Sequence, residues 1–111
     1  MAGKFELKKS NSGKFVFNLK AGNGKVILTS QTYRARAAAM DGIESVKKHA
    51  VDDANFERKT SAKGEPYFVL KAVNAQIIGS SEMYASASAR DKGMASVKAH
   101  APAAAVVDAT A

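Results

Sequence analysis

The chain of 111 residues contains no cysteine, two prolines and only 7% aromatic residues. Without cysteine it can form neither a disulfide nor a sulfur-ligated zinc site, and nothing argues for an oxidising compartment. No window approaches the run of about 18 apolar residues that a membrane helix needs. The start of the chain, Met1–Phe5, lacks the apolar stretch of a signal peptide. We therefore expect a cytoplasmic protein.

Groups that could build a catalytic or metal site are also scarce. His49 and His100 are the only histidines, and no pair of carboxylates lies beside them in the sequence. Zinc and iron sites use three or four protein ligands with recognisable spacing. Both histidines fall at the ends of predicted helices, where an imidazole interacts favourably with the helix macrodipole. We predict a structural role for them, no enzymatic activity, no cofactor and no metal.

Acidic residues are outnumbered, with 10 Asp and Glu against 17 Lys and Arg and a formal net charge of +7. A basic surface favours acidic or polyanionic partners. Net charge of this size also serves solubility alone in small domains, so both interpretations stay open.

What the chain does contain is an internal repeat with a period of 51 residues and no gap. Residues 5–50 match residues 56–101, and 20 of the 46 aligned pairs are identical. A fixed period of this length indicates one supersecondary unit present twice. A unit of about 50 residues is marginal alone. We therefore predict a single domain over 1–111 with a shared core, a short linker at 51–55 and an alanine-rich tail at 102–111.

Each repeat is predicted to contain three strands followed by one helix. Period-2 alternation of apolar residues indicates half-buried strands. The strands are expected near residues 5–8, 15–20, 26–29, 56–60, 66–71 and 76–80. Apolar residues at every third or fourth position then indicate amphipathic helices, within residues 33–50 and 84–101.

The ends and middles of these helices carry further signals. We expect Ser86 to cap the second helix, Thr32 or Ser30 to cap the first, and a proline at 102 to end the second. Gly42 and Gly93 fall in the middle of the two helices, at a cost of about 1 kcal/mol relative to alanine. Because the cost occurs twice, we predict a close approach of each helix to the sheet or to the other helix.

Two such repeats would merge most simply into one largely antiparallel sheet with both helices on a single face, an α+β fold. Side chains alternate between the two faces of a strand, so parity divides them. The predicted core-facing set is Phe5, Leu7, Phe15, Phe17, Leu19, Val26, Leu28, Phe56, Phe68, Leu70 and Ile77.

The opposite face is the candidate partner-binding surface, because no helix covers it. Parity places there, beside Glu6 and Glu57, ten candidate residues: Lys8, Val16, Asn18, Lys20, Ile27, Lys59, Tyr67, Val69, Lys71 and Ile78. Lysines interleaved with apolar side chains suit an acidic macromolecule. Sheet propensity alone also explains exposed β-branched residues.

Two other functions stay open. Nucleic acid could bind through basic residues of the face and helices, namely Lys8, Lys20, Lys59, Lys71, Arg34, Arg36, Lys47 and Lys98. A small ligand or substrate could lie between helix and sheet, near Tyr33, Tyr84, His49 and His100. Since the duplication supplies its own twofold partner, we expect a monomer.

The combined pattern resembles a known family. Phe17-x-Leu19-Lys20-Ala21-x-Asn23, then Ile27-x-x-Ser30-x-x-Tyr33, then Gly42-Ile43-x-Ser45-Val46-Lys47 and its copy at 93–98, are similar to the YegP-like family of small bacterial and archaeal proteins. The resemblance spans Phe5 to about Ala101. It implies a single sheet with C-terminal strands exchanged between the repeats, and it implies no activity or catalytic residue.

Overall fold

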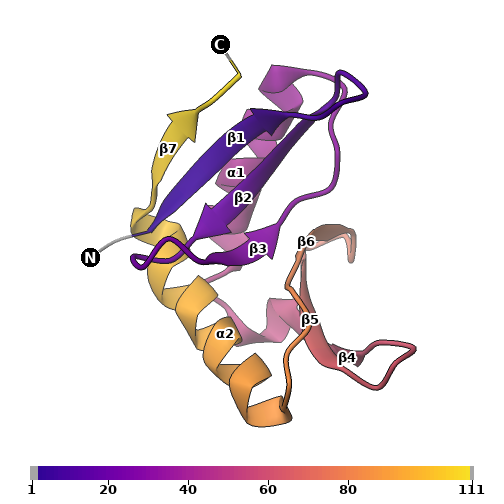
Figure 1. The fold of residues 1–111 in the computed structure, drawn as a ribbon. Helices are drawn as coiled ribbons and strands as arrows, with labels where there is room; N and C mark the ends of the chain where they lie inside the picture. The colour runs from indigo at the N-terminus through magenta and orange to yellow at the C-terminus, as the bar shows by residue number, and fades with distance from the viewer. Residues whose placement is uncertain (1–2, 111) are drawn as a thin grey trace.

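The computed structural model describes residues 3–110, which form a seven-stranded sheet with two α-helices on one face (Figure 1). The first repeat contains β1 (Lys4–Lys9), β2 (Phe15–Lys20), β3 (Val26–Thr29) and α1 (Arg36–His49). The second contains β4 (Phe56–Thr60), β5 (Pro66–Lys71), β6 (Ile77–Ser80) and α2 (Ala87–His100). Two 3₁₀ turns, η1 (Asp53–Asn55) and η2 (Ala101–Ala103), follow the helices, and β7 (Ala105–Asp108) ends the fold. The predicted α+β architecture is confirmed.

The strand order is β4-β5-β6-β3-β2-β1-β7. Each repeat is an antiparallel meander, and the two meanders join through β3 and β6, where Thr29 lies opposite Ser80. β7 comes from the second repeat but pairs in parallel with β1 of the first, so the exchange implied by the family resemblance is present. In Figure 1 the indigo and yellow strands lie side by side, although they are at opposite ends of the chain.

One hydrophobic core contains residues from both repeats. Its largest fully buried side chains include Phe5, Phe17 and Ile43 from the first repeat and Phe68 and Leu70 from the second. Complete burial of such a side chain contributes about 1.5–3 kcal/mol. Because α1 packs against β2, β5 and β6 while α2 packs against β5 and β3, each helix covers strands of both repeats.

The two helices begin differently. The Ser86 hydroxyl accepts a hydrogen bond from the Ala89 amide at 3.1 Å, so the predicted cap of α2 is confirmed. α1 instead begins after Ala35, which offers no side-chain cap, and the predicted caps Thr32 and Ser30 are wrong. The Ser30 hydroxyl is buried in the sheet, where it accepts the Phe17 amide hydrogen at 2.9 Å, and is therefore unavailable to the helix.

The mid-helix glycines make room for tyrosines. A Cβ atom on Gly42 would lie 2.8 Å from Cζ of Tyr33, and one on Gly93 would lie 2.7 Å from Cζ of Tyr84. Each tyrosine ring also stacks on a core phenylalanine, with ring centroids 6.1 Å apart in the first repeat and 6.3 Å in the second. The close approach predicted for the helices is therefore made through a tyrosine held between helix and sheet.

Candidate functional site

The open face is defined here as the side of the sheet turned away from α1 and α2. Directly paired residues of neighbouring strands point to the same face. The pairings therefore place one continuous row on this face, which crosses the sheet from β4 to β7: Glu57, Val69, Ser80, Thr29, Asn18, Glu6 and Val107. The two glutamates stand near opposite ends of the row, one in each repeat.

Each of these glutamates lies between two lysines. Glu6 forms ion pairs with Lys8 and Lys20, both at 3.1 Å. Glu57 forms equivalent pairs with Lys59 at 3.8 Å and with Lys71 at 2.5 Å. A hydrogen bond from Lys20, with a smaller contribution from Lys8, lowers the pKa of the Glu6 carboxyl. A hydrogen bond from Lys71 lowers the pKa of the Glu57 carboxyl. Both carboxylates are therefore charged at neutral pH.

The parity prediction is wrong for the isoleucines. Ile27 and Ile78 are 5% and 7% exposed and belong to the core, not to the open face. The reason is a β-bulge: Leu19 pairs with Leu28, but Lys20 pairs with Val26, so one residue of β3 is skipped. The same shift occurs between β5 and β6, where Leu70 pairs with Gly79 and Lys71 with Ile77. A bulge changes which side chains face inward beyond it.

Val26 and Ile77 consequently replace the two isoleucines on the open face. Both were predicted to be in the core, and both are half-buried opposite the lysines of the ion-pair groups. The open face is therefore still mixed in character, with an apolar side chain next to Lys20 and another next to Lys71.

The remaining predicted face residues differ in accessibility. Val16 and Tyr67 are half-buried and reachable from solvent, but Val69 is only 3% exposed, so a partner cannot contact it unless its neighbours move. The Asn18 amide donates to the Thr29 hydroxyl at 2.9 Å. Sequence reasoning missed Val107, which is 40% exposed beside Glu6, because the pairing of β7 with β1 is a tertiary feature.

The histidines connect the two repeats. Nδ1 of His49 donates to the Ser45 carbonyl at 2.8 Å, and Nε2 accepts from the Val73 amide in the β5–β6 hairpin at 3.3 Å. His100 copies this arrangement, with its Nε2 accepting from the Gly22 amide in the β2–β3 hairpin at 3.4 Å. This pattern requires the neutral tautomer with hydrogen on Nδ1. Both ring nitrogens are thus occupied structurally, by contacts that sequence reasoning did not predict.

The residues of the small-ligand hypothesis are therefore not gathered into a reactive site. Burial raises the pKa of Tyr33 and Tyr84, which keeps both phenols protonated. Among residues 3–110 no cluster of three or more potential ligand side chains could hold a metal ion. Neither α1 nor α2, with 14 residues each, is long enough to cross a membrane, and the described part of the chain has no longer helix.

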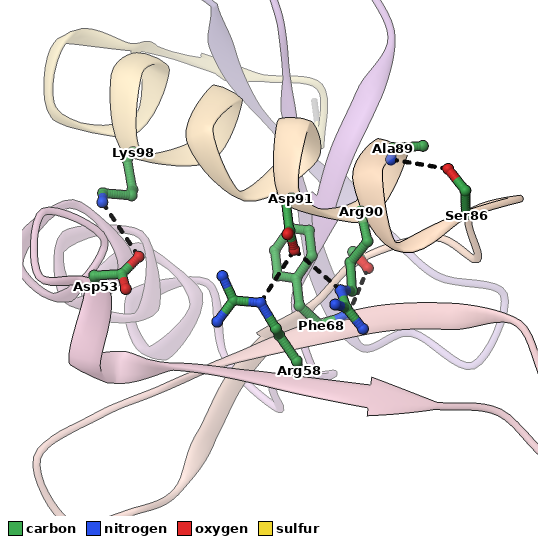
Figure 2. Close-up of polar contacts among 9 residues, drawn as sticks. Asp53, Arg58, Phe68, Ser86, Ala89, Arg90, Asp91 and Lys98 are labelled. Atoms are coloured by element: carbon green, nitrogen blue, oxygen red, sulfur yellow. Dashed lines mark hydrogen bonds and ion pairs between the residues drawn. The ribbon is translucent and has the colours of Figure 1, made fainter.

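Several basic residues outside the open face are engaged elsewhere. Arg36 binds Asp108, Lys47 binds Glu44 and Lys98 binds Asp53. Figure 2 shows that Lys98 points to Asp53 of η1 and that Arg58 of β4 points to Asp91 of α2. The Arg58–Asp91 ion pair has a length of 3.0 Å. The Lys47–Glu44 pair lies within α1, while the other pairs fasten helices to neighbouring segments, so fewer cations are available to a polyanion than the sequence indicates.

The fold and its repeated contacts define a tandem-repeat α+β protein with an exchanged terminal strand. The chain belongs to the family of the domain of unknown function DUF1508, whose model matches residues 10–57 and 61–108. The two matches begin 51 residues apart, which is the period of the repeat.

Relatives cover the whole chain. A UPF0339 protein of Bordetella pertussis is 53% identical over 99% of this chain and 98% of its own length. The UPF0339 protein YegP of Escherichia coli K12 is 51% identical over 99% of this chain and 100% of its own length.

Solved structures of two relatives share the fold. The solution NMR structure of YegP from E. coli has a TM-score of 0.94 at 51% identity and covers 99% of this chain and 95% of its own. That of a UPF0339 protein from Shewanella oneidensis has a TM-score of 0.93 at 46% identity, covering 99% and 93%. The resemblance to the YegP-like family is confirmed, and the E. coli relative is described as a protein of unknown function.

Proposed function

We propose that this chain is a noncatalytic binding module that holds an acidic protein segment on the open face of its sheet. The observation that carries the proposal is the repeated group of one glutamate between two lysines: Lys8–Glu6–Lys20 and Lys59–Glu57–Lys71. Four ammonium groups face two carboxylates, so the two groups together carry an excess positive charge.

The strength of these ion pairs suits exchange with a partner. The lysine side chains of these pairs are 21–46% exposed, and salt bridges at a protein surface contribute only about 0–1 kcal/mol each, so a carboxylate from another molecule can compete for a lysine at little cost. Val26 and Ile77 beside Lys20 and Lys71 supply apolar contact area. A partner with acidic and apolar side chains in alternation, as in an extended polypeptide, matches this surface.

The proposal is tested by NMR chemical-shift mapping with a Glu- and Asp-rich peptide that contains phenylalanine. We expect saturable shifts at open-face residues of β1, β2, β4 and β5. The double variant Lys20→Gln/Lys71→Gln should weaken binding several-fold. The matched control is Lys14→Gln/Lys63→Gln, which removes the same charge from the tips of the β1–β2 and β4–β5 hairpins. Equal loss in both variants, or shifts confined to the helices, would contradict the proposal.

Nucleic acid is the alternative outcome. Binding of labelled single-stranded or duplex DNA or RNA at low salt, with a steep loss of affinity as salt rises, would favour it. Among the ten candidate residues of the open face, Tyr67 is the one aromatic side chain on which a base could stack. Because single-stranded nucleic acid is bound by stacking several successive bases, we argue for a protein partner instead. The proposal includes a cytoplasmic location and a monomeric state, which fractionation and analytical ultracentrifugation would check.

A further inference from the structure

A pocket of about 270 Å³ lies on the helix side of the sheet, between elements of the two repeats. One wall is the β2–β3 hairpin, with Asn23, Lys25 and Ile27. The other wall comes from the second repeat and includes Tyr84 and residues 89–96 of α2. The pocket is distinct from the open face, because Ile27 and Gly93 belong to the buried, helix-facing side of the molecule.

The pocket wall is better preserved between the two halves than the internal repeat as a whole. Of its nine lining residues, seven have an identical counterpart 51 positions away, as Tyr84, Gly93 and Asn23 show with Tyr33, Gly42 and Asn74. Across the whole repeat the proportion is 20 of 46. Most of the wall is therefore built from residue types that both halves of the chain share.

The two lining residues that differ are both lysines. Lys25 corresponds to Gln76, and Lys92 corresponds to Asp41. The pocket thus carries two positive charges, where the equivalent positions of the other half carry one negative charge. Within residues 3–110 neither Lys25 nor Lys92 forms an ion pair, in contrast to the four paired lysines of the open face.

The lining offers more than charge. Ile27, Ala21 and Ala89 together with the Tyr84 ring provide apolar walls, while Asn23 and Ser96 provide hydrogen-bonding groups. Burial of the Tyr84 phenol raises its pKa, so its hydroxyl remains a donor. Small-molecule sites combine such apolar walls with a few convergent polar groups.

We propose that this pocket binds a small organic anion, with a carboxylate or phosphate between Lys25 and Lys92 and a compact apolar body against Ile27 and Tyr84. Two ammonium groups without a carboxylate partner select the charge of the ligand. The volume of the pocket limits the body to about the size of one aromatic ring, since drug-sized ligands occupy about 300–1,000 Å³.

The test uses the full chain and three probes: benzoate, phenyl phosphate and benzylamine. NMR titration with benzoate or phenyl phosphate should show saturable shifts at residues 21–27 and 84–96. Titration with the cation benzylamine should not produce saturable shifts at these residues. Inorganic phosphate should bind more weakly than phenyl phosphate, because it lacks the apolar body. Comparison of benzoate with phenyl phosphate distinguishes a carboxylate site from a phosphate site.

Two exchanges of residues between the repeats provide the controls. Lys25→Gln/Lys92→Asp gives the pocket the residues of the other half, and it should weaken anion binding at least tenfold, which is about 1.4 kcal/mol. Gln76→Lys/Asp41→Lys should create shifts at residues 72–78 and 33–45. All four positions are exposed, so the fold should tolerate both exchanges.

Three results would overturn the proposal: no saturable shift at the pocket wall with either anion, equal binding of benzylamine, or unchanged anion affinity in Lys25→Gln/Lys92→Asp. Because the open-face lysines are intact in that variant, loss of anion binding without loss of peptide binding separates this pocket from the function proposed for the open face.

Discussion

The two repeats agree in the contacts that hold the fold together and differ in the charges around them and in the residues that occupy their turns. In both, a buried serine hydroxyl accepts a sheet amide, from Phe17 to Ser30 at 2.9 Å and from Phe68 to Ser81 at 3.0 Å. An unpaired buried amide costs about 1–3 kcal/mol, which explains why such serines are present in both copies. The identity of these two serines therefore reflects a hydrogen bond that admits few alternatives.

The edges of the sheet show the largest difference. The outer side of β1 is covered by β7, whereas β4 is the last strand on its side of the described sheet. The chain that follows α1 leads through η1 directly into β4, so it cannot supply a covering strand as the chain after α2 does. The two edges thus differ because the segment after α1 forms β4 itself, whereas the segment after α2 forms β7 beside β1.

The largest effect that tests the contacts shared by the two repeats is expected at the mid-helix glycines. Gly42→Ala and Gly93→Ala should each lower the free energy of unfolding by about 2 kcal/mol, because the new methyl group overlaps a tyrosine ring. Urea denaturation would measure both. In a Tyr33→Ala background, Gly42→Ala should instead stabilise by up to about 1 kcal/mol through helix propensity. If Gly42→Ala is destabilising in that background as well, the Tyr33 ring is not what requires a glycine at position 42.

The next test concerns a turn that has the same backbone hydrogen bonds in both repeats but a different residue at its positive-φ position. Gly24 has φ of +83°, and its counterpart Ala75 adopts +66°, a conformation that costs an alanine about 1–2 kcal/mol. Ala75→Gly should therefore stabilise by about 1 kcal/mol, and Gly24→Ala should destabilise by a similar amount. Thermal denaturation of both variants checks this, and a loss of stability in Ala75→Gly would mean that the turn is not strained.

The helix caps allow a smaller exchange. Ser86→Ala should cost about 1 kcal/mol, because the Ala89 amide loses its acceptor. Ala35 already has the extended conformation of a cap residue, with φ of −131° and ψ of 148°. Ala35→Ser should therefore stabilise α1 by about 0.5–1 kcal/mol. Chemical denaturation should show that the free energy of unfolding falls in Ser86→Ala and rises in Ala35→Ser. A change of the same sign in both variants would contradict the difference between the two helix starts.

The smallest expected effect is a pH dependence at the covered edge. Hydrogen bonds from the Thr110 hydroxyl and amide, together with Arg36, lower the pKa of Asp108 from 3.8 to about 2. Because the pKa is lower in the folded state, this stabilisation is complete above pH 3.8 and disappears as the pH falls through 2. Carboxyl ¹³C NMR should show the low midpoint. In Arg36→Ala the midpoint should rise only part of the way to 3.8, and an unchanged midpoint would exclude a role for the arginine.

Much of the fold could be predicted from the sequence, because the repeat and the two periodicities are local patterns. Strands such as Phe15–Lys20 and the Ser86 cap depend on neighbouring residues alone. Ile27 and Ile78 could not be placed correctly, since a bulge depends on how two strands pair and not on alternation within one. The contacts of His49 and His100 were missed for a similar reason: their partners lie in the other repeat.

The parallel pairing of β1 and β7 also has a mechanical consequence. The chain enters at the start of β1 and leaves at the end of β7, and Ala109 extends the ladder by donating to the Leu7 carbonyl at 2.8 Å. A pulling force on the two ends of the molecule would slide these strands lengthwise and strain their hydrogen bonds together, whereas peeling would break them one at a time. Optical-tweezer measurements should therefore find a higher rupture force from the two ends than from residue 9, at the end of β1, and the C-terminus, a pair of attachment points that would peel β7 from β1.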